Sequence, residues 1–272
     1  MIVLAGPYVG SFEHEILTFR PYVRWLVEVS EEKIYVSTHF NRFFLYQKFI
    51  QDDYLLPVFE NLTRDEINQS GYVHKTVKQR DYNIIIKNAK DLIVDREKCN
   101  KKDIEICNIS YVKSTPPQSI YNKLFSRIED YFDIENPYKD KIIFIPANTD
   151  FKDRLSKVRK FLNNYENIVT VGDKKTRFRD DNVLLKRIDY VENGWKLIIR
   201  IISEARAVIC PISHWTTICN LQRVPVFSWG ENVGQHRLDG IYNFGNKDCI
   251  TIASDRIEII QSMIANFLEK VR

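Results

Sequence analysis

The sequence predicts an α/β protein composed of two halves, each built around a parallel sheet. Three observations support this fold class. Short apolar segments alternate with amphipathic segments of helical period, and the alternation is regular from residue 141 onward. Gly, Pro, Asn or Asp often follow the apolar segments, as expected where strands end. With 272 residues, of which 44% are hydrophobic, the chain can form two modest cores.

In the first half, an apolar strand is expected over residues 2–9 and a helix over 10–28. The apolar side of that helix comprises Phe12, Ile16, Phe19, Val23 and Leu26. Pro21 is expected to kink the helix or to start a new one after Phe19. The other segments expected in this half are strands at 33–40, 54–59, 82–94 and 100–112 and a helix at 41–50.

In the second half, strands and helices are expected to alternate to the end of the chain. The strands are expected at 141–148, 166–173, 182–190, 206–213, 224–230 and 248–253. The helices are expected at 150–165, 193–205, 214–222 and 254–272. Pro137, with its polar flanks, is the expected linker, so the predicted domains are 1–138 and 139–272. The last helix is a candidate to pack back on the first domain.

Composition and charge restrict the class of protein. The formal net charge of +4 does not suggest a polybasic nucleic-acid binder, although it is compatible with a phosphate-bearing ligand. The five cysteines form no C-x-x-C pair, which favours a reducing compartment and argues against a zinc site. We therefore predict a cytoplasmic protein with no metal site, no signal peptide and no membrane span.

Polar residues follow several strands of the second half. They are Asn148, Gly172 with Lys174, and Ser213 with His214, while Arg237 follows the strand at 224–230. In a parallel sheet these residues share one edge, where helix N-termini attract phosphate groups. The alternatives are that Ser213 only caps a helix, that His214 is solvated, and that the loop of Lys174 is solvated too.

The segment "ISHWTTICNLQRVPVFSW" resembles the donor domain of GT-B-fold glycosyltransferases, especially the heptosyltransferase pattern. It departs from that pattern because the glycine after the serine is absent and Arg223 replaces the glycine before Val224. The opening "GSFEHEI" is similar to a G-x-F-x-x-E-[LI] turn found in glycosyltransferases of bacteria and phages. The resemblance implies two Rossmann-like domains facing a cleft, with the acceptor on 1–138 and a nucleotide-sugar donor on 139–272.

This resemblance implies a metal-independent glycosyltransferase whose nucleotide-sugar is a co-substrate, with no further cofactor. No D-x-D motif, which metal-dependent sugar transferases normally use, occurs in the chain. Sugar transfer needs a base for the acceptor hydroxyl, and Glu15 is the first candidate, with Glu13 and His14 as alternatives. These acidic residues could instead only complement a helix dipole. The expected donor-binding residues are Asn148, Gly172, Lys174, Ser213, His214 and Arg237.

The acceptor is expected to be a glycan, or a hydroxymethylated DNA base if the gene comes from a phage. Two other functions stay open at this point. One is a sugar-nucleotide epimerase of the same fold, and the other is a non-catalytic protein that binds a nucleotide or a glycan. The sequence does not indicate an oligomeric state.

Overall fold

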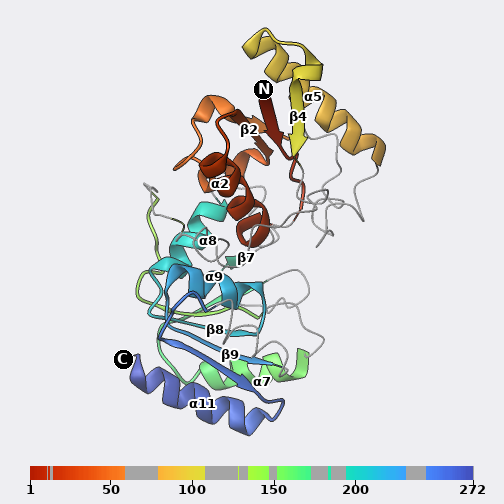
Figure 1. The fold of residues 1–272 in the computed structure, drawn as a ribbon. Helices are drawn as coiled ribbons and strands as arrows, with labels where there is room; N and C mark the ends of the chain where they lie inside the picture. The colour runs from red at the N-terminus through yellow and green to blue at the C-terminus, as the bar shows by residue number, and fades with distance from the viewer. Residues whose placement is uncertain are drawn as a thin grey trace. The chain divides into compact units, whose positions relative to one another are not determined.

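The computed structural model describes residues 1–10, 12, 15–58, 79–107, 128, 134–146, 152–172, 183–184, 194–230 and 243–271. The chain divides into two compact units, Met1–Phe125 and Ser126–Arg272. Each unit contains its own parallel sheet (Figure 1). Each also has its own hydrophobic core.

The N-terminal unit is built on a four-stranded parallel sheet in the order β3-β2-β1-β4. The strands are β1 (Ile2–Ala5), β2 (Lys33–Thr38), β3 (Leu55–Pro57) and β4 (Ile104–Cys107). The chain runs outward from β1 to β3 and then returns to place β4 on the other side of β1. The strand order therefore reverses beside β1, which is the position where open α/β sheets bind ligands at their carboxyl edge.

Helices cover both faces of this sheet (Figure 1). Helix α5 (Gln79–Glu97) packs Ala89 and Ile93 against Leu4 and Tyr35 of the sheet. On the other side, a π-helical turn η1 (Glu15–Phe19) leads into α2 (Arg20–Val29), which has a proline in its first turn. This change of helix type confirms the prediction that a new helix starts after Phe19, because proline fits the first turn, where no N–H donor is required.

One element of the N-terminal unit was predicted wrongly. The segment 82–94 lies within α5 and is a helix instead of a strand. Its buried side chains are Tyr82, Ile85, Ala89 and Ile93. They are spaced by three or four residues, which is the helical period. The residues expected as a helix at 41–50 begin in the short 3-10 helix η2 (Phe40–Leu45). The other 3-10 turns described in this unit are η3 (Asp52–Tyr54) and η4 (Lys101–Asp103).

The C-terminal unit has a six-stranded parallel sheet in the order β10-β9-β8-β5-β6-β7. The strands are β5 (Ile142–Phe144), β6 (Ile168–Gly172), β7 (Val183–Leu184), β8 (Ala207–Pro211), β9 (Val226–Gly230) and β10 (Cys249–Ala253). The chain runs from β5 to β7 on one side and crosses back to place β8 on the other. The strand order therefore reverses between β5 and β8, so this sheet has its own switch point.

Two pairs of helices enclose the C-terminal sheet (Figure 1). Helices α7 (Lys152–Leu162) and α11 (Ile257–Lys270) lie on one face, and α8 (Gly194–Ser203) and α9 (His214–Gln222) lie on the other. Helix α11 buries Ile260, Ile264 and Phe267 in the same cluster as Phe227 of β9. Each such side chain contributes about 1.5–3 kcal/mol relative to an exposed one. Among the helices in the described ranges, none is both long and apolar enough to span a membrane.

Candidate functional site

The turn after β1 is fixed against the end of β2. Gly6 has a φ of +100°, and a Cβ atom at this position would lie 2.6 Å from the Ser37 carbonyl oxygen. Two residues later, the Tyr8 amide donates a hydrogen bond of 2.8 Å to that same oxygen. Glycine is required at residue 6 because the backbone of β2 occupies the space of a side chain. The turn therefore has a defined position at the switch point of the N-terminal sheet.

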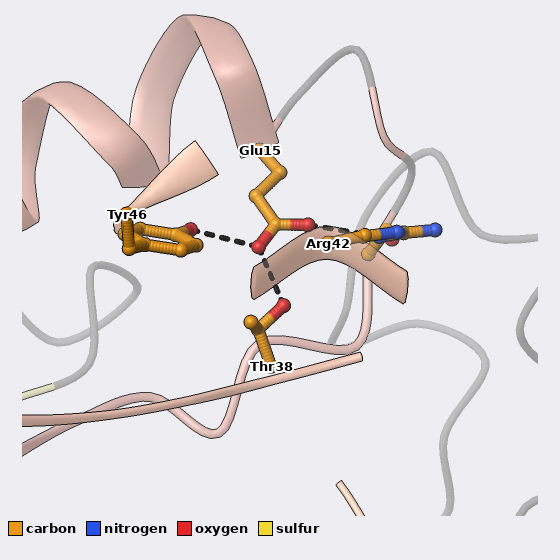
Figure 2. Close-up of polar contacts among 5 residues, drawn as sticks. Glu15, Thr38, Arg42 and Tyr46 are labelled. Carbon is orange, nitrogen blue, oxygen red and sulfur yellow. Dashed lines mark hydrogen bonds and ion pairs between the residues drawn. The ribbon is translucent and has the colours of Figure 1, made fainter. Parts of the chain in front are cut away.

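The carboxylate of Glu15 lies at the end of this turn and is fully buried, with an exposed fraction of 0%. Its Oε1 accepts hydrogen bonds from the hydroxyls of Thr38 (2.5 Å) and Tyr46 (2.7 Å). Its Oε2 accepts a charged hydrogen bond of 3.0 Å from Nη1 of Arg42. Figure 2 shows the carboxylate surrounded by these three side chains, which come from β2, η2 and the residue after η2. Three donors therefore satisfy a charge that water does not reach.

Arg42 connects Glu15 to the rest of the turn. Its guanidinium is 2% exposed, and its Nη1 also donates a hydrogen bond of 2.7 Å to the carbonyl of Gly10. Its Cζ lies 5.8 Å from the centre of the Phe12 ring, a cation–π distance. Arg42 thus contacts the turn before and after the positions of Glu13 and His14.

Burial dominates the electrostatics of this cluster. Desolvation raises the pKa of the Glu15 carboxyl above its usual value of 4.5, while Arg42 and the hydrogen bonds from Thr38 and Tyr46 act in the opposite direction. Burial and the Glu15 charge raise the pKa of Tyr46 well above 10, so its hydroxyl remains a donor. A buried carboxyl with a raised pKa and a fixed orientation is suited to acid–base chemistry.

Of the three residues predicted as the base, the structure describes one. Glu15 lies in the cluster, whereas Glu13 and His14 are outside the described residues. The sequence did not predict Thr38, Arg42 or Tyr46 as site residues. No spacing in the sequence connects them to Glu15, because the parallel pairing of β1 with β2 brings them together.

The carboxyl edge of the C-terminal sheet contains the second group of predicted residues. Ser213 follows β8 at the switch point and caps α9: its Oγ accepts from the Trp215 amide at 3.3 Å, while Thr216 Oγ1 accepts from the Ser213 amide at 3.2 Å. His214 is the exposed first residue of α9. Gly172 ends β6, which is parallel to β8, so it lies at the same edge.

The remaining predicted donor-binding residues lie outside the described part of the chain. They are Asn148, Lys174 and Arg237. Within the described residues, no group of three or more His, Cys, Asp or Glu side chains could hold a metal ion.

Comparison with known proteins rests on structure alone. No protein-family model and no curated protein matches the sequence. The chain is similar to the E. coli heptosyltransferase WaaC with ADP, with a TM-score of 0.50, 8% identity and coverage of 100% of this chain and 99% of that one. This chain has the GT-B fold. The fold class predicted from the sequence is thereby confirmed.

Two other solved structures align with this chain at lower TM-scores. The E. coli ADP-heptose LPS heptosyltransferase II aligns with a TM-score of 0.45 and 9% identity, covering 100% of this chain and 99% of that one. The Methanocaldococcus jannaschii UDP-GlcNAc 2-epimerase in complex with UDP-GlcNAc and UDP aligns with a TM-score of 0.43 and 11% identity, covering 98% and 92%.

Proposed function

We propose that the chain is a glycosyltransferase that moves a sugar from a nucleotide-sugar donor to an acceptor hydroxyl. The observation that carries this proposal is the buried Glu15 carboxyl, held by three donors at the switch point of the N-terminal sheet. The similarity in fold to a heptosyltransferase solved with ADP supports it. A carboxylate that only complements a helix dipole can stay exposed at the helix N-terminus. Glu15 is instead removed from water and bound to Thr38, Arg42 and Tyr46.

The reaction has one proton transfer and one displacement. The base takes the proton of the acceptor hydroxyl while the oxygen bonds to the anomeric carbon of the donor sugar. The bond from that carbon to the diphosphate breaks, and the nucleoside diphosphate leaves with both electrons. The charge that develops on the diphosphate is stabilised by N–H groups at a helix N-terminus such as that of α9, which follows Ser213.

Glu15 is the proposed base, and Glu13 is the alternative in the same turn. The three hydrogen bonds described for the Glu15 oxygens come from side chains, two on Oε1 and one on Oε2. A carboxylate offers about four acceptor positions, so Oε2 can take up the transferred proton without displacing them. Its raised pKa favours holding the transferred proton. If Glu13 is the base, Glu15 and Arg42 fix the backbone on which Glu13 is placed.

Two isosteric variants separate these roles. Glu15→Gln is expected to reduce kcat by at least about 100-fold, in line with the loss of a general base. The matched variant Glu13→Gln is expected to retain most of the activity. The opposite result would assign the base to Glu13. Donor binding should persist in both variants, because both residues are in the N-terminal unit, whereas the proposed donor-binding residues are in the C-terminal unit.

The donor is identified first, by the shift in melting temperature with UDP-, GDP-, ADP- and CMP-sugars. Release of the nucleoside diphosphate is then measured with the donor that binds. If a nucleotide-sugar binds but no nucleoside diphosphate is released with any acceptor, the result would favour a non-catalytic nucleotide-binding protein. We also propose that turnover is metal-independent and therefore unchanged by EDTA.

We further propose a cytoplasmic location. None of the five cysteines is in a disulfide, as expected in a reducing compartment.

A further inference from the structure

Phe40 lies at the carboxyl edge of the N-terminal sheet and is largely exposed. It follows β2 by two residues, and 71% of its surface is accessible. Among the described residues, it is the one aromatic side chain in the group of exposed large hydrophobics, whose other members are Met1, Val29, Ile106 and Ile259. A single exposed apolar residue is ordinary on a protein surface. Phe40 differs from such a residue because it lies at the sheet edge where Thr38 binds Glu15.

Phe40 is paired with a second ring on the same side of η2. The centroids of Phe40 and Phe43 are 5.4 Å apart, and the rings are inclined at 63°. In a 3-10 helix, residues i and i+3 are eclipsed, so the two rings lie on one side of the helix. Arg42 and Leu45, also separated by three residues, are buried on another side. The helix therefore has an aromatic outer side and a buried inner side.

The buried side of η2 is fixed to the candidate catalytic turn. Arg42 donates to both Gly10 and Glu15, as described above. At the other end of η2, Nε of Arg20 donates a hydrogen bond of 2.8 Å to the carbonyl of Leu45. The aromatic pair is thus presented by a helix that cannot move without breaking buried hydrogen bonds. This rigidity suits a binding surface, since little freedom is lost when a ligand binds.

We propose that Phe40, supported by Phe43, stacks against the apolar C–H face of a pyranose ring of the acceptor. This inference rests on the proposed function and specifies its acceptor. The face of an aromatic ring carries partial negative charge, which attracts the weakly positive C–H groups of a sugar face. A sugar bound there lies at the same sheet edge as Glu15, because Thr38, two residues before Phe40, binds that carboxylate.

The charge of the segment that contains Phe40 favours a neutral glycan over DNA. Along the described segment 39–54, the exposed charged side chains are Lys48, Asp52 and Asp53, with one positive and two negative charges. A surface that contacts DNA phosphates needs clustered Lys or Arg side chains. The exposed part of this segment instead carries an excess of negative charge, so a flipped-out DNA base is the less favoured occupant.

Saturation-transfer NMR on the full chain tests this inference directly. The probes are the methyl glycosides of glucose, galactose and mannose, and the nucleoside 5-hydroxymethyl-2′-deoxycytidine. We expect transfer to the C–H protons of one pyranose face, and Phe40→Ala should weaken the affinity about 5- to 10-fold, as for the loss of one stacked aromatic partner. Phe40→Tyr, which keeps an aromatic ring, should retain the native affinity.

A matched control is Val29→Ala, which removes another exposed apolar side chain of the same unit, at the end of α2. It should leave glycoside binding unchanged. The inference is overturned if no glycoside binds, if Val29→Ala weakens binding equally, or if only the nucleoside depends on Phe40. Circular dichroism of Phe40→Ala should match the native spectrum, because the side chain is exposed.

Failure of this inference is distinguishable from failure of the proposed function. If the donor is turned over but glycoside binding does not depend on Phe40, the stacking site is contradicted and the transferase proposal stands. If glycoside binding depends on Phe40 but no nucleotide-sugar is turned over, the transferase proposal is contradicted and the sugar-binding site stands.

Discussion

The carboxyl edge of the N-terminal sheet and that of the C-terminal sheet are each stabilised by a different kind of contact. In the N-terminal unit the edge is fixed by buried charges, with Glu15 bound to Arg42 and Arg20 bound to the backbone of η2. In the C-terminal unit, the capping box of Ser213 and Thr216 at the equivalent edge is made by hydroxyl and backbone groups. The topology is similar in both, because each sheet reverses its strand order beside a central strand.

This difference separates the chemical tasks of the two edges. A buried carboxyl can exchange a proton, and the surrounding donors set its pKa. A capped helix N-terminus has no proton to exchange, but its N–H groups and dipole attract anions. Under the proposed function, the first edge supplies the acid–base chemistry and the second binds the diphosphate.

The largest effect is expected when the buried ion pair is broken. Arg42→Met leaves the Glu15 carboxylate in a dry site without its cation. The free energy of unfolding of the N-terminal unit should fall by about 3–5 kcal/mol. Urea denaturation at pH 7 measures this loss. The double variant Arg42→Met/Glu15→Gln should recover part of it, and a double variant no more stable than the single one would show that the pair is not coupled.

A second prediction concerns the pH dependence of stability. The folded pKa of Glu15 lies above the usual 4.5, so between those two values the folded protein binds this proton more tightly than the unfolded chain. The stability of the native protein relative to Glu15→Gln should therefore fall as the pH rises through this window. One proton limits the slope to about 1.4 kcal/mol per pH unit.

Thr38→Val sharpens this test. The variant removes a hydrogen bond that lowers the pKa of Glu15, so the window should extend to higher pH. Parallel stability curves for native protein and Glu15→Gln between pH 4.5 and 8 would contradict a raised pKa.

The sequence predicted more of the fold than of the site, for a physical reason. Strand and helix segments are local, and their apolar spacing appears in a short window, as with Phe12, Ile16 and Phe19. The failure at 82–94 has the same origin. Three consecutive isoleucines, Ile84 to Ile86, resemble a buried strand and obscure the helical spacing of the residues that are buried.

The sequence predicts a role for Glu15 because its turn follows the first strand and because of the resemblance in "GSFEHEI". Its partners could not be identified in this way. Arg42 is 27 residues away and belongs to a 3-10 helix, whose position depends on strand pairing. Its burial is a tertiary property, since an isolated arginine in the sequence is usually exposed.

A buried amide network in the C-terminal unit provides the neutral counterpart of the Glu15 cluster. Nδ2 of Asn246 donates to Oδ1 of Asn220 at 3.0 Å and to the Val224 carbonyl at 2.8 Å. Asn246→Ala should reduce stability by about 1–3 kcal/mol, because two buried acceptors lose their donor. The loss should be the same at pH 5 and pH 8.

The control for this variant is Asn243→Ala, which loses one exposed hydrogen bond to the Gly245 amide. Its effect should be smaller than that of Asn246→Ala. A pH-dependent loss in Asn246→Ala would contradict the contrast between the two units.

The smallest effect is expected at the cap of α9, where stability and ligand binding can be separated. Ser213→Ala should cost about 1 kcal/mol, whereas Ser213→Gly should cost only a few tenths, because glycine is tolerated at a helix N-cap. Both variants lack the hydroxyl. Ser213 is one of the expected donor-binding residues. If its hydroxyl binds the donor diphosphate, both variants should lose the same part of the melting shift caused by the nucleotide-sugar, despite their different stabilities. Ser213→Thr should retain the shift. A full shift in Ser213→Ala would limit Ser213 to capping and leave donor binding to the backbone of α9.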